Sequence, residues 1–509
     1  MSGSYSSQEE IDRTIGTLRA TFRSGRSKDV KYRKWQLKQL YWLVADNHQL
    51  FVHALHKDLG RPEFETRLGL KAMQDDIVYH IKHVEKWARG ETPKSGFLFT
   101  NIGRTYLRAE PRGVVFIIGP WNFPDTLTIC PLAAAISAGC TALIKPSELA
   151  ANFTDLLVKL APKYLDSEAY AVLTGSASET QYMLSHKFDH VFFTGSTPVA
   201  KHVAAAAAKH LTPTVLELGG QCPAIVTKSA NVDLAAKRIA AAKFMNAGQI
   251  CLSVNHVFID PSVHAEFIER LKYWNEEFTT NGENDAMCTI INERNFGRLE
   301  ELLGNTKGNI VYGGIGHDRN LLKLKTTVVD NVSLEDSLLS EELFGPLLPI
   351  VEADYKHAVE TINKLAHPLG LYVFSHDQTE IDHVLDNTLS GGVTINDALL
   401  HAGVPEVPFG GVGDSGMGAY HGKYGFDTFT HKRVVAQMPD WLDRFMGFRY
   451  PPYDLTKSNP MTTFSPPPFK RGETLQDQKS ESGVTALSLG VAAFVGGLAV
   501  VLVWGQELI

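Results

Sequence analysis

The feature that most restricts the fold of this chain is an alternation of short apolar runs with longer helix-like segments. Residues 114 to 118 (VVFII) form an uninterrupted apolar run ended by Gly119-Pro120, which is typical of a strand buried on both faces. The further strand-like runs are residues 141–144, 169–173, 190–193 and 214–216, and the helix-like segments between them are 127–138, 152–165 and 198–210. Strands separated by helices of this length indicate βαβ units and a parallel sheet.

The same pattern resumes after residue 217 and predicts a second α/β region that extends to about residue 400. Its first strands are expected at 224–226 and 254–259, with a long helix between them. Before the first sheet, the spacing of apolar residues predicts helices over residues 8 to 58 and 63 to 86, followed by an edge or connecting strand at 106–110. A chain of 509 residues is too long for one small core, so two or three domains are expected.

Composition and charge exclude several classes of protein. The net charge of -7 provides no basic surface for nucleic acid, and no nucleic-acid partner is expected. The five cysteines are few and odd in number, and no C-x-x-C pair occurs, so neither a zinc ribbon nor thioredoxin-type chemistry is predicted. No metal is therefore expected, and a reducing compartment fits best.

The end of the chain predicts a membrane anchor. Residues 484–504 contain no charge over 21 positions, long enough to span the hydrocarbon core of a bilayer, and only five residues follow. A buried core helix is the alternative, but the polar tract before this segment and Trp504 favour a single-pass tail anchor. Basic residues upstream place the bulk of the chain on the cytosolic side. The endoplasmic reticulum is the expected membrane, with other organelle membranes left open, and the proline-rich residues 449–483 are expected to be a linker.

One cysteine is placed where a nucleophile could lie. Residues 244–253 (FMNAGQICLS) put Cys251 directly after a Gly-Gln turn that follows a helix-like run. A thiol with its own N–H free can supply both a nucleophile and an oxyanion donor. The alternative is a small buried hydrophobic residue, which is the usual role of a free cysteine.

Polar residues follow the predicted strands of the first sheet, where ligands of parallel sheets gather. Asn122 follows the first strand, Lys145 and Glu148 the second, and Glu217 ends a later one. Residues 195–198 (GSTP) open a helix after a strand, so the helix N-terminus can meet a phosphate. Each of these features alone is as readily explained by a turn or a surface charge.

Together these stretches resemble the aldehyde dehydrogenase family. The resemblance covers about residues 10 to 453 and rests on the motifs WNFP, KPSE, FTGST, LELGG, NAGQIC, EELFGP and PFGGVGDSGMG, in the family's order. The segment PFGGVGDSGMGAYHGKYGFDTF and the later RYPP look most like class 3, the branch that includes membrane-anchored fatty aldehyde dehydrogenases.

The resemblance implies a role for each motif. Cys251 would be the nucleophile, Asn122 and the Cys251 N–H would hold the oxyanion, and Glu217 would be the general base. The residues implied to bind the cofactor are Lys145, Glu148, Gly195, Ser196, Thr197, Val199, Ala200, Glu342 and Phe344. Phe409 would line the substrate entrance. NAD is the expected cofactor because the Glu148 carboxylate would repel a 2′-phosphate, although NADP stays possible because Lys145 lies beside it.

The resemblance also implies the domain organisation. A Rossmann-like NAD-binding domain (1–217) would be followed by a second α/β catalytic domain (218–400), with residues 87–110 contributing to a small β bridging and oligomerisation element. Residues 401–448 would form a closing loop and an oligomerisation tail, and a homodimer is expected.

Two departures and three alternatives accompany this interpretation. Ala200 replaces a common glycine, and Gln221-Cys222 follow LELGG in place of Lys-Ser, which removes a charge near the cofactor side. The leading hypothesis is oxidation of long apolar aldehydes, and polyene apocarotenoid-type or aromatic aldehydes are the alternative substrates. A non-catalytic scaffold, or a CoA-acylating enzyme that Glu217 disfavours, would be a different class of function.

Overall fold

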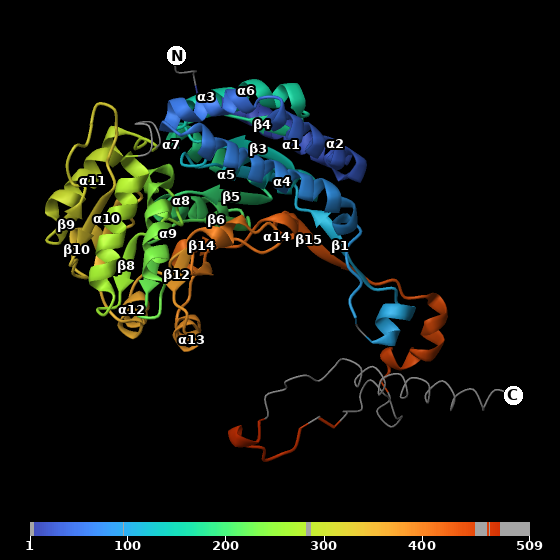
Figure 1. Ribbon diagram of the computed structural model, residues 1–509. Helices are drawn as coiled ribbons and strands as arrows, with labels where there is room; N and C mark the ends of the chain where they lie inside the picture. The colour runs from blue at the N-terminus through green and yellow to red at the C-terminus, as the bar shows by residue number, and fades with distance from the viewer. Residues whose placement is uncertain (1–4, 95, 281–286, 454–465, 468, 479–509) are drawn as a thin grey trace. The chain divides into compact units, whose positions relative to one another are not determined.

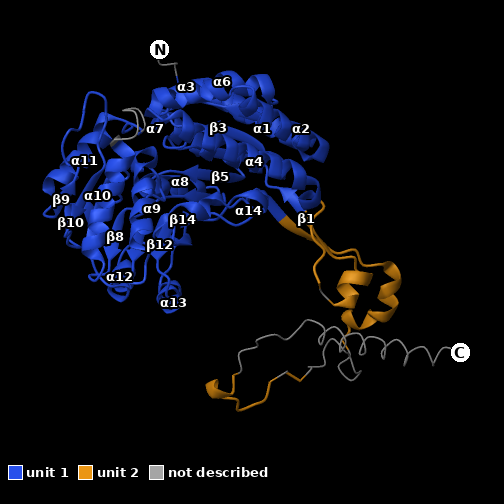
Figure 2. Ribbon diagram, viewed as in Figure 1, with its two compact units in different colours: residues 1–88, 109–431 blue, residues 89–108, 432–509 orange. Residues whose placement is uncertain are grey.

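The computed structural model describes residues 5–94, 96–280, 287–453, 466–467 and 469–478. The chain divides into two compact units (Figure 2): one of residues 1–88 and 109–431, the other of residues 89–108 and 432–509. Within the described ranges, no helix is both long and apolar enough to cross a membrane. The predicted anchor, residues 484–504, lies outside the described residues, as does much of the predicted linker.

The first sheet is built from the apolar runs that the sequence predicts as strands. Its six strands lie in the order β14-β6-β5-β2-β3-β4. The bounds are β2 (Val114–Ile118), β3 (Thr141–Lys145), β4 (Tyr170–Val172), β5 (His190–Thr194), β6 (Thr214–Glu217) and β14 (Gly416–Met417). All neighbours are parallel except β14, which pairs antiparallel with β6. The predicted parallel α/β arrangement is thereby confirmed.

Both faces of this sheet are covered by helices, which explains why its central strands are continuously apolar. Along β2, Val114, Phe116 and Ile118 face a cluster shared with α1 and α8, whereas Val115 and Ile117 face a cluster shared with α4 and α5. Burying an aliphatic or aromatic side chain contributes roughly 1.5–3 kcal/mol, so each strand is stabilised from both sides. The covering helices are α1 (Gln8–Ser24), α2 (Val30–Ala45), α3 (His48–Leu59), α4 (Glu63–Ala88), α5 (Thr126–Ala138), α6 (Ala151–Tyr164), α7 (Ala177–Ser185), α8 (Thr197–Ala208) and α14 (Gly422–Thr428).

The second sheet has seven strands in the order β13-β12-β7-β8-β11-β10-β9. The bounds are β7 (Pro223–Val226), β8 (His256–Ile259), β9 (Asn309–Tyr312), β10 (Thr327–Asp330), β11 (Leu347–Glu352), β12 (Gly370–Phe374) and β13 (Gly392–Ile395). Only β9 at the edge is antiparallel to its neighbour. The predicted strand at 254–259 is thus shorter than expected, because β8 begins at His256.

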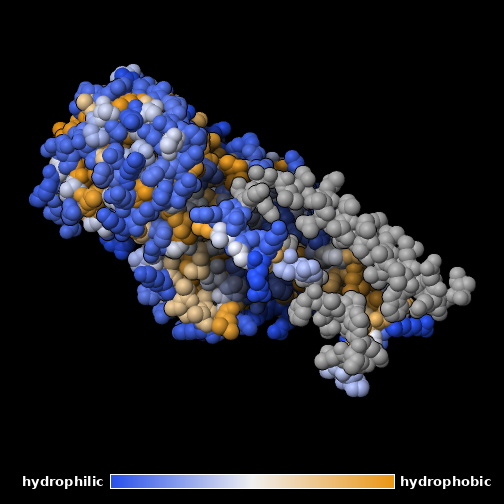
Figure 3. Space-filling model, turned by 90° about the horizontal axis from the view of Figure 1, so that it is seen from below, coloured by the Kyte–Doolittle hydropathy of each residue, from blue (hydrophilic) through white to orange (hydrophobic). Residues whose placement is uncertain are grey.

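Helices cover this sheet on both faces as well (Figure 1). One face packs on α9 (Val232–Phe244) and α10 (His264–Thr280), the other on α11 (Glu293–Asn305), α12 (Tyr355–Ile362) and α13 (Gln378–Asn387). The surface around these cores is mostly hydrophilic in the view of Figure 3, with separate hydrophobic patches. Both sheets belong to one compact unit, and a domain boundary at residue 217 stays a prediction.

The two remaining described strands pair with each other. β1 (Tyr106–Pro111) and β15 (Thr430–Val435) pair in a two-stranded sheet, which confirms the predicted strand at 106–110. The role of this sheet as a bridging element stays a prediction.

Candidate active site

The candidate site is a pocket of about 1010 Å³ at the carboxyl ends of the first sheet's strands. β2, β3, β5 and β6 are parallel neighbours, so the residues that follow them meet at one edge. Ten of the thirteen predicted site residues line this pocket: Asn122, Lys145, Glu148, Gly195, Ser196, Val199, Glu217, Cys251, Glu342 and Phe344. The strand-end prediction therefore located the pocket, although it left the role of each residue open.

Three predicted site residues do not line the pocket. Ala200 is buried in the core beside α1, and its small side chain packs there. The Thr197 hydroxyl donates to the Asp414 carbonyl oxygen at 3.4 Å, which links α8 to the 410–418 loop. Phe409 is buried among aromatic rings, stacked on His421 with ring centroids 5.2 Å apart.

The loop that carries Cys251 is held in an unusual backbone conformation. After α9 ends, a short turn (Met245–Gly248) has Asn246 at φ 48° and Ala247 at φ 51°, both in the left-handed region. Gly248 is also left-handed, and a Cβ there would collide with the Gly345 carbonyl. Strain of this kind persists only when the surroundings over-determine it, and this turn fixes where the half-buried Cys251 lies.

A buried polar network provides those surroundings. Asn246 Nδ2 donates to the carbonyl oxygens of Asn122 at 3.1 Å and Gln249 at 3.0 Å. Asn122 Nδ2 in turn donates to the Gln249 carbonyl oxygen at 3.1 Å. The network joins the end of β2 to the cysteine loop, and the second Asn122 amide proton is left for another acceptor.

Arg61 lies beneath this network and was not predicted from the sequence. Its side chain is only 2% exposed and donates to the Asn122 carbonyl oxygen, with Asp125 at 3.6 Å and the Phe123 ring at 4.5 Å. The guanidinium group fixes the backbone that presents the Asn122 amide. Its sequence context, an arginine before a proline at a helix start, gave no signal of this burial.

The nucleophile end of the pocket contains buried acidic groups without partners. Glu217 is 3% exposed, and neither carboxylate oxygen has a hydrogen-bond partner in the structure. Burial raises the pKa of Glu217 well above its usual value. Burial, together with the charges of Glu342, Cys222 and Glu217, also raises the pKa of the Cys251 thiol. These surroundings favour the neutral thiol of Cys251 over its thiolate.

Glu342 faces the same region from the second sheet's side. One of its oxygens, Oε1, has no partner, and a Cβ at Gly219 would strike this carboxylate. Burial raises the pKa of Glu342 to about 7, while the Gly220 N–H, Arg298 and Lys243 lower it. Nearby, Phe344 packs edge-on against Trp121 with centroids 5.3 Å apart.

The opposite end of the pocket has paired charges. Lys145 is 5% exposed, and its Nζ lies 2.6 Å from Glu148 Oε2. The N-terminus of α8 opens toward the pocket at Gly195 and Ser196, and Gly195 N donates to the Glu217 carbonyl oxygen at 3.0 Å. A helix N-terminus favours an anionic group such as a phosphate.

These residues fit a dinucleotide cofactor. The pocket runs from the Lys145–Glu148 pair past the α8 N-terminus to Cys251, and the unpaired Glu342 oxygen offers an acceptor for a sugar hydroxyl. Arg294 and Arg298, which were not predicted from the sequence, also line this pocket from α11. Arg298 holds the Glu342 loop through the carbonyl oxygen of Leu343 at 2.6 Å. Among the described residues, no group of His, Cys, Asp and Glu side chains is arranged to hold a metal ion.

Comparison with known proteins identifies the class of protein. The model of the aldehyde dehydrogenase family matches residues 1–435. A solved structure of Staphylococcus aureus AldH in a substrate-bound state superposes with a TM-score of 0.82 at 34% identity, covering 86% of this chain and 98% of that one. The chain belongs to the aldehyde dehydrogenase family.

Individual relatives show which branch of the family this chain resembles. The chain is 39% identical to the mouse aldehyde dehydrogenase family 3 member A2, over 91% of this chain and 96% of the relative. It is 39% identical to the rat dimeric NADP-preferring aldehyde dehydrogenase (87% and 98% covered) and 41% identical to the beta-apo-4'-carotenal oxygenase of Neurospora crassa (88% and 84% covered). The predicted resemblance to class 3 is confirmed. The protein is an enzyme that oxidises aldehydes with NAD or NADP.

Proposed function

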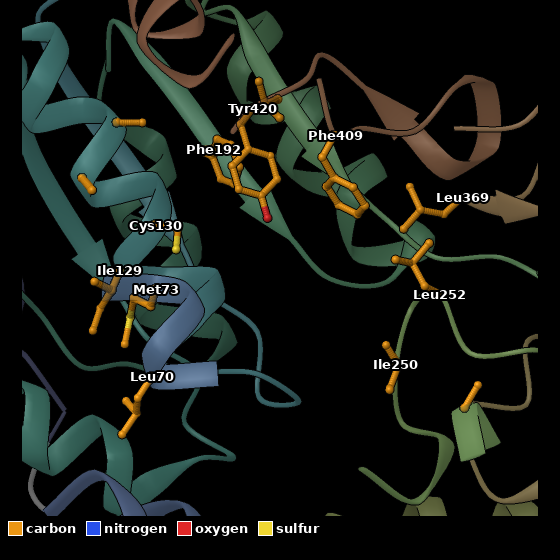
Figure 4. Close-up of a cluster of buried hydrophobic side chains, with 14 of the residues drawn as sticks. Leu70, Met73, Ile129, Cys130, Phe192, Ile250, Leu252, Leu369, Phe409 and Tyr420 are labelled. Atoms are coloured by element: carbon orange, nitrogen blue, oxygen red, sulfur yellow. The ribbon is translucent and has the colours of Figure 1, made fainter. Parts of the chain in front are cut away.

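We propose that this enzyme oxidises long, apolar aldehydes to carboxylic acids through a covalent intermediate on Cys251. The observation that carries the proposal is the apolar environment of the nucleophile loop. Ile250 and Leu252 flank Cys251 and belong to a hydrophobic cluster against which Cys251 itself packs. Figure 4 draws part of that cluster, with Ile250 and Leu252 on this loop; the other labelled members are Leu70, Met73, Ile129, Cys130, Phe192, Leu369, Phe409 and Tyr420. An alkyl chain gains about 0.8 kcal/mol for each CH₂ group that it buries.

The first half-reaction uses Cys251 and Asn122. The Cys251 thiol first releases its proton to solvent, and the thiolate then attacks the aldehyde carbon, so that the former carbonyl oxygen becomes the oxyanion of a thiohemiacetal. The free amide proton of Asn122 and the Cys251 N–H stabilise that charge. Loss of a hydride from this carbon, for which a bound NAD(P) would be the acceptor, leaves a Cys251 thioester.

The second half-reaction uses Glu217. Its carboxylate takes a proton from water while the water oxygen attacks the thioester carbon, and the acid leaves as the Cys251 thiolate is restored. The raised pKa of Glu217 suits a general base, because a stronger base removes the proton more readily. Hydrolysis by this route favours a free acid product over transfer to another thiol.

We assign cofactor binding to the two charged regions of the pocket. Lys145 and Glu148 would hold the adenosine ribose, Gly195 and Ser196 the pyrophosphate, and Glu342 with Phe344 the nicotinamide ribose and ring. NAD is the preferred cofactor in this proposal, because the Glu148 carboxylate would repel a 2′-phosphate.

The substrate class is tested with two aldehydes of different length. The purified enzyme should have a higher kcat/KM for hexadecanal than for acetaldehyde, and equal values would contradict the proposal. Met73→Gln places a polar amide in the cluster, so it should lower kcat/KM for hexadecanal and spare acetaldehyde. Met183→Gln is the matched control, because Met183 is equally buried but packs in α7, on the other face of the first sheet.

A polyene aldehyde is the second candidate substrate. The likeness to the Neurospora crassa beta-apo-4'-carotenal oxygenase favours it. A rigid polyene and a flexible alkyl chain require pockets of different shape. A higher kcat/KM for an apocarotenal than for hexadecanal would favour the polyene, and the reverse would favour the alkyl aldehyde.

We further propose a homodimer that is anchored by residues 484–504. The name of the rat relative supports the dimer, and so do exposed aromatic side chains in the second unit, including Phe97, Phe99, Trp441 and Phe445. Light scattering of the purified chain tests the dimer. Alkaline carbonate extraction from endoplasmic reticulum membranes tests the anchor, since a chain ending at residue 483 should be released while the full chain stays.

A further inference from the structure

Two buried side chains hold the backbone on the carboxyl side of the proposed nucleophile. The Cys222 thiol donates to the Cys251 carbonyl oxygen at 3.3 Å, and the Tyr372 hydroxyl donates to the Leu252 carbonyl oxygen at 2.5 Å. Both side chains are fully buried, and neither takes part in the chemistry proposed above. Because a peptide unit is planar, two bonded carbonyl oxygens in succession fix the path of the chain directly after Cys251.

Cys222 is itself held by the second sheet. It lies one residue before β7, and its carbonyl oxygen accepts from the Asn255 N–H at 2.8 Å. Its sulfur accepts from the N–H of Gly370, the first residue of β12, at 3.3 Å. A Cβ at Gly370 would lie only 2.9 Å from Leu252 Cδ2, so β12 begins directly against the nucleophile segment. The thiol of Cys222 therefore bridges the Cys251 backbone to the start of a buried strand.

The Cys222 sulfur has the proton that this bridge needs. Burial raises the pKa of Cys222 to about 12, because a thiolate would lose its contact with water. At neutral pH the group is therefore a thiol, which donates its proton to one partner and accepts from another. A serine hydroxyl has the same two capacities, whereas an alanine side chain has neither.

We propose that Cys222 is a positioning residue, which holds the Cys251 backbone in the orientation that directs the nucleophilic sulfur and the Cys251 N–H into the pocket. The inference rests on the nucleophile role that is proposed for Cys251. With the Cys251 carbonyl oxygen fixed, rotation of the backbone at this residue is restricted, and the Cα–Cβ bond keeps its direction. A misplacement of ~1 Å between reacting atoms costs about 10²-fold in rate. Loss of the bridge should therefore slow the attack on the aldehyde and leave aldehyde binding unchanged.

The experiment follows the first turnover of the purified full chain with NAD and hexadecanal by stopped-flow measurement of NADH. Cys222→Ala removes both contacts of the sulfur, so the first-turnover rate at saturating aldehyde should fall ~10-fold. The aldehyde concentration at half-maximal rate should stay within about twofold of native. Cys222→Ser keeps a donor and an acceptor, so its first-turnover rate should lie within about threefold of native. A loss confined to the concentration dependence would contradict the proposal.

Cys140→Ala is the matched control. Cys140 is also fully buried, and its thiol donates to the Phe429 carbonyl oxygen at 3.3 Å, but it does not line the pocket. The two alanine variants lose the same kind of group and the same kind of hydrogen bond, so their Tm values should fall by similar amounts. Only Cys222→Ala should lose first-turnover rate. Equal first-turnover rates in the two variants, or no recovery in Cys222→Ser, would overturn the proposal.

Two further variants keep the result decisive. Cys222→Val fills the space of the thiol without a donor, so it should show the same loss of rate if the alanine variant is too unstable to purify. Cys251→Ala separates this proposal from the one on which it rests. If Cys251→Ala turns over substrate, the nucleophile role of Cys251 fails. If Cys251→Ala is inactive while the variants of Cys222 that lack a donor react at the native rate, only the Cys222 proposal is overturned.

Discussion

The charged residues at the two ends of the pocket differ in whether they have a partner of opposite charge or a hydrogen bond. At the Lys145–Glu148 end, the buried ammonium lies 2.6 Å from a carboxylate oxygen and the charges are compensated. At the Cys251 end, both oxygens of Glu217 and one of Glu342 are buried without partners. The first end is arranged to bind a ligand with little change. The second end holds groups in an unfavourable environment, which is how reactive residues acquire shifted pKa values.

The largest effect should come from the nucleophile. Cys251→Ala should lower kcat by ~10⁴-fold or more, because no other thiol lines the pocket in the described part of the chain. The rate of NAD(P)H formation measures this. Cys140→Ala is the control, a fully buried cysteine outside the pocket, and it should retain activity. Substantial turnover by Cys251→Ala would instead favour a different catalytic group.

The next largest loss of activity should come from replacing Glu217, whose carboxylate has no hydrogen-bond partner. Glu217→Gln should lower steady-state turnover by ~10²–10⁴-fold, since hydrolysis loses its general base, while a first burst of NAD(P)H remains. It should leave Tm unchanged or raised, because the Glu217 carboxylate has no hydrogen bonds to lose in the part of the chain that the structure describes. Glu380→Gln is the matched control: this buried glutamate accepts from Ser229 and Ser375 at 2.8 Å, so its loss should lower Tm without affecting the burst. An equal fall in Tm for Glu217→Gln and Glu380→Gln would contradict the difference between an unpartnered and a hydrogen-bonded carboxylate.

The raised pKa of Cys251 predicts a reactivity that depends on pH. Since the thiolate reacts and the thiol does not, the alkylation rate by iodoacetamide should rise ~10-fold per pH unit as long as the pH is below that pKa. The experiment uses cofactor-free enzyme and follows Cys251 modification by mass spectrometry. A rate that is already constant at neutral pH would show that the thiolate is formed there.

The smallest effect should come from the compensated end. Glu148→Gln removes the carboxylate that would repel a 2′-phosphate, so the ratio of kcat/KM for NADP to that for NAD should rise by about 3- to 10-fold. Glu168→Gln is the control, because Glu168 also pairs with a cation, Arg26 at 2.7 Å, but lies outside the pocket. An unchanged ratio would mean that Glu148 does not face the phosphate.

Local patterns predicted the first sheet well and the second one incompletely. The runs that form β2, β3 and β5 are short, apolar and bounded by turns. Their burial can therefore be predicted from adjacent residues alone. The strands from β9 to β13 were expected only as a continuation of the pattern. The short helix α7 was missed, because it has only two buried residues and little periodicity.

The sequence by itself determined the order along the chain of the parallel strands in the first sheet, the chemical types of the residues at the strand ends, and the family. It did so because hydrophobic period and motif spacing are properties of neighbouring residues. Only the tertiary structure decided which charges are paired. The Asn246–Asn122 contact joins residues 124 positions apart, and the burial of Arg61, Glu217 and Lys243 depends on segments from different elements. A charge state follows from the solvent and charges around a group, and folding alone brings those together.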